Sequence, residues 1–134
     1  MTKKFFSFIT VMIFTLTVLT ACAVENTNPH QFVFEKQEAV TLTINEEEIA
    51  CVGIYGTYTN NSDESACVAD WVSVKAFQNG VELSPIVPSD ERTNDYLQCD
   101  KYIQPTQSEK VIFLFTLQDS SEVTIEIDGQ KIEP

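Results

Sequence analysis

The sequence predicts an all-β fold, an antiparallel sandwich of two packed sheets. Three observations lead to this prediction. Apolar residues alternate with polar ones in several short segments, turn-forming residues separate these segments, and helical periodicity is nearly absent after the N-terminal segment. About seven short strands in roughly one hundred residues are typical of a sandwich.

The first predicted strands lie between residues 32 and 59. Residues 32–34 form a short apolar run, and the apolar residues of 40–44 alternate with threonines, as in a half-buried strand. Residues 49–59 are apolar on both faces, which predicts a central strand. Gly53 and Gly56 inside it indicate a bulge or a close approach of another backbone.

A hairpin is the most specific local prediction. Residues 60–65 have the composition of a loop, and Trp71 to Gln78 follow as a strand, with Trp71 expected in the core. Asn79-Gly80 predicts a type I′ turn. This turn would pair Gln78 with Val81, and the following strand would return through Leu83. One face of the hairpin should then collect Val72, Val74, Ala76, Val81 and Leu83.

The second half of the chain contains a long irregular connection and two further strands. Residues 85–107 include three prolines and a charged middle, which indicates either a short extra strand or a functional loop. Residues 111–117 are apolar on both faces and predict a buried central strand. Residues 123–127 alternate, which predicts a strand with one face in water.

The N-terminus has the pattern of an export signal. Lys3 and Lys4 precede an uncharged apolar run over residues 5–18, and Leu19-Thr20-Ala21-Cys22 resembles the lipobox of bacterial lipoproteins. This resemblance implies cleavage between Ala21 and Cys22 and attachment of diacylglycerol to the Cys22 thiol. The alternative is an uncleaved membrane helix with a chance cysteine.

The resulting domain organisation has three parts. Residues 1–21 are expected to be a removed signal peptide, residues 22–31 a flexible tether, and residues 32–134 one sandwich domain. Acyl chains on Cys22 would supply the anchoring that stable membrane attachment requires. The protein is therefore expected on the cell membrane, lipid-anchored and facing away from the cytoplasm.

The mature chain is strongly acidic. The whole chain carries a formal charge of −12, and the signal segment holds two of the eight basic residues and no acid, so the mature chain would carry −14. Such a surface repels nucleic acid, which excludes it as a partner. Cationic partners or divalent ions would be attracted, although a charged exterior also serves solubility alone.

Several stretches together carry a family resemblance: Thr59 to Ser62, Ala76 to Leu83, Ile103 to Pro105, and the strands 111–117 and 123–127. They resemble the Ig-like domain of Gram-positive surface lipoproteins known as domain of unknown function 5067, over roughly Val40 to Ile127. The resemblance implies an immunoglobulin-like sandwich on a lipoprotein, no established activity, and no functional residues to carry over. Thr106 stands where the family pattern has glycine, which puts that turn in doubt.

Three cysteines remain after Cys22 is lipidated: Cys51, Cys67 and Cys99. An exported domain permits disulfides, and three thiols allow one bond in three ways. We predict Cys67–Cys99, which would fasten the 85–107 connection to the sandwich, with Cys51 as a buried free thiol. The alternative Cys51–Cys99 bond would bridge two sheets over Trp71, as in antibody domains.

The sequence contains no recognisable catalytic, cofactor or metal motif. The spacings of 16 and 32 residues between the cysteines match no zinc pattern. The only histidine, His30, falls in the expected tether and is therefore a poor catalytic base. Two further sets of residues offer hypotheses: Asp63, Glu64, Asp90, Glu91, Asp95 and Asp100 as a calcium site, and Tyr55, Tyr58, Tyr96 and Tyr102 as a binding surface.

Two hypotheses of function follow. The first is a non-catalytic module that binds a protein, an envelope polymer or a cation, with the 85–107 connection facing outward. The second is an acid-dependent hydrolase of the cell envelope. That hypothesis predicts a carboxyl group with a raised pKa inside a cleft.

Overall fold

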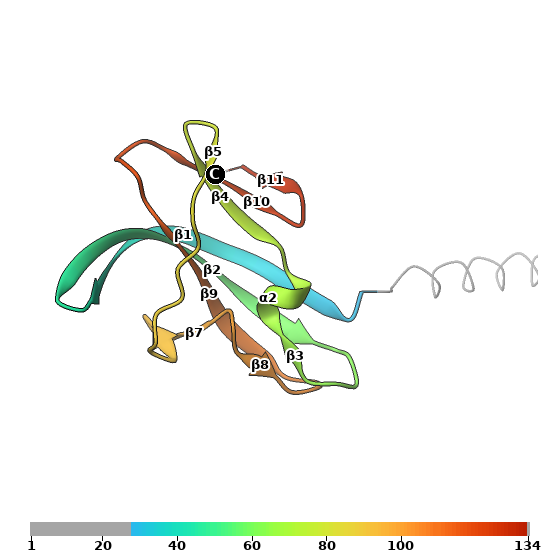
Figure 1. Cartoon of the computed structure of the whole chain (residues 1–134). Coiled ribbons are helices and arrows are strands. Elements are labelled where there is room, and N and C mark those ends of the chain that lie inside the picture. Colours follow the sequence, from blue (N-terminus) through green and yellow to red (C-terminus); the bar gives the residue numbers. More distant parts are fainter. Residues whose placement is uncertain (1–27, 134) are drawn as a thin grey trace, which may run out of the picture.

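The computed structural model describes residues 28–133 as a β-sandwich and confirms the predicted all-β fold (Figure 1). The predicted signal peptide, its cleavage site at Ala21 and the lipidation site Cys22 lie outside the described residues. Among residues 28–133, no helix is long and apolar enough to cross a membrane.

One layer is a five-stranded sheet. Its strands, in spatial order, are β1 (His30–Ile44), β2 (Glu47–Asn60), β9 (Ser108–Thr116), β7 (Tyr96–Gln98) and β6 (Arg92–Thr93). The pairs are antiparallel except that β7 runs parallel to β9, which departs from the predicted purely antiparallel arrangement. Because β1 begins at His30, the expected tether over residues 22–31 is wrong at its last two positions.

The other layer is a four-stranded sheet, ordered β11 (Gln130–Ile132), β10 (Val123–Ile127), β4 (Val74–Gln78) and β5 (Val81–Glu82). A separate two-stranded ladder joins β3 (Ala66–Cys67) to β8 (Tyr102–Ile103). A single helical turn, α2 (Val68–Trp71), follows β3 directly. Figure 1 shows α2, β3 and β8 near the end where β1 begins, away from the β1–β2 turn.

A β-bulge in β1 decides which of its side chains face the core. Phe34 pairs with Gly56 and Lys36 pairs with Tyr55, so Glu35 is the extra residue. Before the bulge, the even-numbered Phe34 packs against the core between the sheets. After it, the even-numbered Val40 packs against a second cluster on the outer face of the five-stranded sheet.

The structure therefore has two apolar clusters, one on each face of β2 and β9. The main core lies between the sheets and is built on Val52, Ile54, Tyr58, Val111, Phe113, Phe115 and Ile125, among others. The outer cluster consists of Val40, Leu42, Cys51, Tyr55, Ile112 and Leu114, with Ile86 and Tyr96 packed against it. Both faces of β2 and β9 are buried, which confirms the prediction of two central strands.

The predicted hairpin is correct in register and turn type but not in burial. Gln78 pairs with Val81, and Asn79 and Gly80 have φ values of 53° and 77°. Val81, expected in the core, is 59% exposed because β5 is only two residues long and forms the edge of its sheet.

Trp71 is also not in the core. It ends α2, where the expected strand has not yet begun, and 57% of it is exposed. The Ala69 amide donates to the Cys99 carbonyl at 3.0 Å, which ties this helical turn to the segment that precedes β8. A hydrogen bond between distant parts of the chain therefore overrides the strand pattern that begins at Trp71.

The 85–107 connection contains extra strands, one of its two predicted forms. Backbone hydrogen bonds from Thr116 to Ser84 and from Ile86 to Leu114 continue the sheet beside β9, at 2.9 Å each. The connection then forms β6, β7 and β8. Thr106, which stands where the family pattern has glycine, has a φ of 66°, a conformation that favours glycine. The turn therefore keeps the backbone conformation that a glycine would adopt, although the residue differs.

Gly56 should be irreplaceable, since a Cβ atom there would lie 2.3 Å from Cζ of Phe32 and 2.5 Å from the Val33 carbonyl oxygen. The backbone oxygen cannot yield without breaking the β1–β2 ladder. We expect Gly56→Ala to lower the free energy of unfolding by roughly 2–3 kcal/mol, measured by urea denaturation. Gly129→Asn is the control and should lower it by no more than about 1 kcal/mol, because the site is open and asparagine enters the positive-φ region more readily than most residues. Equal effects of the two changes would contradict this packing.

Candidate functional site

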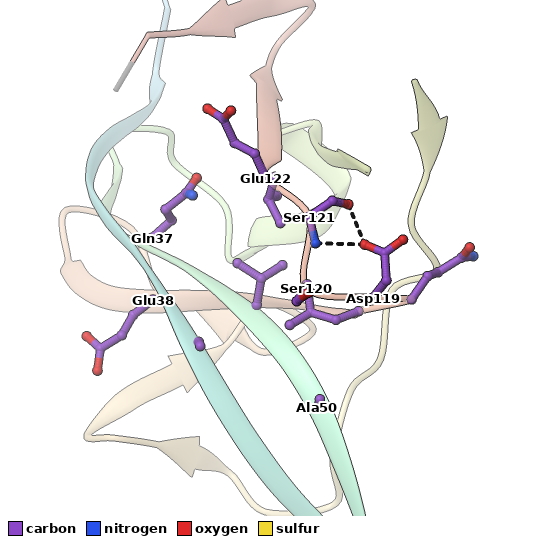
Figure 2. Close-up of a pocket in the computed structure, with 12 residues that line it drawn as sticks. Gln37, Glu38, Ala50, Asp119, Ser120, Ser121 and Glu122 are labelled. Atoms are coloured by element: carbon purple, nitrogen blue, oxygen red, sulfur yellow. Dashed lines mark hydrogen bonds between the residues drawn. The ribbon is translucent and has the colours of Figure 1, made fainter. Parts of the chain in front are cut away.

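A cavity of about 650 Å³ opens between β1, β2 and the loop that joins β9 to β10 (Figure 2). Its apolar lining comes from Ala39, Ala50, Val52, Leu117 and Val123. Its polar lining comes from Gln37, Glu38 and residues 118–122. A concave site with an apolar floor and a few polar groups is the usual form of a small-ligand or peptide-binding site.

The bulge at Glu35 creates this cavity. After the bulge, β1 turns its large apolar side chains to the outer face and leaves Gln37 and Ala39 on the inner side, opposite Ile54 and Val52. Figure 2 shows Gln37 and Glu38 pointing to opposite sides of β1. Ala39 and Ala50 are too small to fill the space between the sheets, so the end of the sandwich stays open.

The β9–β10 loop is held rigidly by one buried amide, that of Gln78. Its Oε1 accepts the Gln118 amide at 2.8 Å, and its Nε2 donates to the carbonyls of Asp119 at 3.1 Å and Ser121 at 2.9 Å. Gln78 is 3% exposed, so these bonds are shielded from water. The Leu117 amide also donates to the Ala50 carbonyl at 2.9 Å, so the cavity wall is pre-formed.

Asp119 carries the most strongly fixed charge at the rim. Its carboxylate accepts hydrogen bonds from the side chain and the backbone amide of Ser121 and from Asn79, which together lower its pKa (Figure 2). Glu35, on the outer face of β1, also has a lowered pKa, because Tyr96 and Thr57 donate hydrogen bonds to it. A hydrolase acid needs the opposite shift, so these carboxyl groups give that hypothesis no support.

His30 lies at the other end of the domain and is not part of a tether. It is 6% exposed, and its Nδ1 is hydrogen-bonded to the Tyr58 hydroxyl at 2.7 Å. Its ring also stacks on Trp71, with 3.9 Å between the ring centroids. The expectation that His30 lacks fixed geometry is therefore wrong, because β1 begins two residues earlier than its apolar pattern indicates.

The predicted disulfide partners are neighbours in space. Cys67 donates a weak hydrogen bond from Sγ to the Cys99 carbonyl at 3.8 Å, and Cys51 lies in the outer cluster with its pKa raised by burial. In this structure Cys51, Cys67 and Cys99 are free thiols, so the Cys67–Cys99 bond stays a prediction. Burial raises the pKa of Cys99 to about 11.

The acidic residues of the hypothetical calcium site are not brought together. In the part of the chain that the structure describes, no three His, Cys, Asp or Glu side chains gather closely enough to hold a metal ion. The four tyrosines do not form one surface: Tyr55 and Tyr96 are in ring contact, but Tyr55 and Tyr58 are buried, Tyr96 is half-buried and only Tyr102 is exposed.

Sequence reasoning missed Gln78 as the residue that shapes the cavity. A signal was present, since Gln78 is two residues from Ala76 in the same strand, next to a type I′ turn. Its side chain therefore lies on the same inward face as that of Ala76. A glutamine at an inward position must find hydrogen-bond partners, and these are the backbone groups of a neighbouring loop. Which loop supplies them is decided by the pairing of β4 with β10.

Comparison with known proteins identifies one family. The model of the family described as "Domain of unknown function (DUF5067)" matches residues 25–129. No curated protein and no solved structure matches the chain.

Gln78→Met should loosen the β9–β10 loop, because methionine fills the same space but offers no partner for the loop amides and carbonyls. We expect amide hydrogen exchange at Gln118 to rise at least tenfold and the free energy of unfolding to fall by about 1–3 kcal/mol. Asn79→Gly is the control, since it removes only the exposed side-chain bond to Asp119 and keeps the turn. Unchanged exchange in Gln78→Met would show that the amide does not hold the loop.

Exported protein should contain a Cys67–Cys99 bond and a free Cys51. Peptide mapping without reduction, after alkylation under denaturing conditions, should recover the 67–99 cross-link and alkylated Cys51. Cys51→Ala should leave the cross-link intact, whereas Cys67→Ala should leave Cys99 alkylated. A cross-link that contains Cys51 would contradict the predicted pairing.

Proposed function

The chain belongs to the DUF5067 family of domains, and from that premise we propose that it is a lipoprotein held through Cys22 on the outer surface of the cytoplasmic membrane. Its sandwich acts there as a binding module rather than an enzyme. The observation that supports this proposal best is the place of the cavity, which opens well away from the end of the domain where the chain enters from residue 28.

The length of β1 sets this separation. Residues 37–39 of the cavity lie seven to nine residues beyond His30 along one strand, which is about 25 Å at roughly 3.3 Å per residue. The eight residue steps from Cys22 to His30 could span at most about 28 Å. An anchored domain would therefore keep His30 near the lipid and present the cavity to partners in the envelope.

The lining of the cavity limits its ligand. The floor offers small apolar side chains, the rim offers amides and hydroxyls, and Asp119 and Glu122 contribute negative charge. An anionic ligand would be repelled, which agrees with the exclusion of nucleic acid as a partner. A segment of a protein or of an envelope polymer that is neutral or positively charged fits this chemistry.

The experiment places a photo-reactive phenylalanine analogue at Gln118, on the rim, in the full-length chain expressed in its host. Irradiation of intact cells should yield a discrete cross-linked species. Ala50→Leu, which fills the cavity from an exposed position, should abolish that species while the protein level is kept. The same analogue at Glu126, on β10 and outside the cavity lining, is the control and should not yield it.

A second arm tests the anchor. Cys22→Ser should release the protein from membranes or block its processing, and fractionation with intact-mass measurement detects either result. Retention and processing like those of the unchanged chain would contradict lipid attachment. A cross-link that persists in Ala50→Leu would instead contradict the cavity as the binding site, so the two parts of the proposal fail separately.

A further inference from the structure

We propose that a second concave surface, the Trp71 groove, binds an organic cation that combines an ammonium group with an apolar body. The groove holds about 560 Å³ and lies between the β4–β5 hairpin, α2 and the segment 85–87. It shares no lining residue with the cavity of Figure 2, and the inference does not rest on the proposed function.

The groove is built around an exposed but immobilised indole. Trp71 is 57% exposed, yet His30 stacks on its ring at a centroid distance of 3.9 Å and an interplanar angle of 15°. His30 is in turn fixed by its 2.7 Å hydrogen bond to the buried Tyr58 hydroxyl. A tryptophan ring that is held in place from behind is a ready surface for a cation, which is attracted by the negative face of the ring.

Apolar side chains supply the rest of the lining. Leu83, Phe113 and Phe115 border the groove from the main core, and Val87, which is 45% exposed, borders it from the segment after Pro85. An exposed Trp and an exposed Val beside one groove form an apolar surface larger than scattered single residues. A ligand with a hydrocarbon portion would remove this surface from water.

The charges around the groove favour a ligand that carries positive charge. Four carboxylates line it, and three of them, those of Asp70, Asp100 and Asp128, have no basic side chain within salt-bridge distance among residues 28–133. The one basic residue of the lining, Lys75, is paired with Glu82 at 3.9 Å. The Ser73 amide donates to Asp128 Oδ1 at 2.9 Å, which fixes that carboxylate at the rim.

These observations favour an alkylammonium ion over a neutral or anionic ligand. The aromatic ring and the unpaired carboxylates attract positive charge together, while the apolar lining accepts the hydrocarbon. A small inorganic cation lacks the hydrocarbon, and no described cluster of ligands could hold a metal ion. The ligand class is therefore an organic cation.

Trp71 is the only tryptophan in the chain, so its fluorescence reports on this groove alone. The full chain, extracted in a maltoside detergent, is titrated with choline and with hexyltrimethylammonium at constant ionic strength. Both should give a saturable fluorescence change, with the hexyl compound binding at least tenfold more tightly than choline. The neutral isostere 3,3-dimethylbutanol should bind at least tenfold more weakly than choline.

Charge variants complete the test. Asp128→Asn keeps the backbone conformation and the acceptor for Ser73, and together with Asp100→Asn it should weaken binding of the hexyl compound at least fivefold. Asp90→Asn, outside the groove, should not change it. Equal binding of the neutral isostere, an absence of saturation, or full binding by the double variant with its β-sheet circular dichroism intact would each overturn the proposal.

Discussion

One extra residue in β1, Glu35, is the constraint on which the rest of the structure depends. A strand alternates its side chains between two faces, and an inserted residue exchanges those faces for everything that follows. Phe32 and Phe34 therefore reach the core between the sheets, whereas Val40 and Leu42 lie on the outer face. The same chain segment serves two apolar clusters, and the space that it vacates between the sheets becomes the cavity.

Glu35 is held in place by groups from two other strands. Its carboxylate accepts the Thr57 hydroxyl at 2.8 Å and the Tyr96 hydroxyl at 2.7 Å. Tyr96 also meets the Tyr55 ring edge to face, with 4.7 Å between centroids, and belongs to the outer cluster. The bulge and the segment that covers the outer face are therefore linked through Glu35 and Tyr96.

Two buried amides turn long loops into rigid walls. Gln78 holds the β9–β10 loop at the cavity end, and Asn60 holds the loop that follows β2 at the end where β1 begins. The Asn60 Nδ2 donates to the carbonyls of Glu64 at 2.9 Å and Ile103 at 2.8 Å, while its Oδ1 accepts from Ser62. Both residues satisfy otherwise unpaired backbone groups, which is why these connections keep a fixed form without regular structure, and the one held by Gln78 lines the cavity.

The sequence by itself determined the elements whose pattern is local. Alternation in residues 40–44 and 123–127, continuous apolar runs in β2 and β9, and Asn79-Gly80 predicted the sandwich, its central strands and the register of one hairpin. The glycine in the middle of β2 likewise signalled a close backbone approach, and Gly56 lies against the Phe32 ring and the Val33 carbonyl. These features depend on neighbours along the chain or on a period of two, so they can be read without knowing the fold.

Only the tertiary structure decided which face each side chain takes and which residues meet. Trp71 has the size of a core residue but is exposed, because it lies in α2, which a hydrogen bond ties to Cys99, and the strand begins only at Val74. His30 lies in a polar stretch but is buried, because its partners Tyr58 and Trp71 are 28 and 41 positions away in the chain. The candidate sites depend on such distant pairings and on a single inserted residue, and no local pattern encodes either.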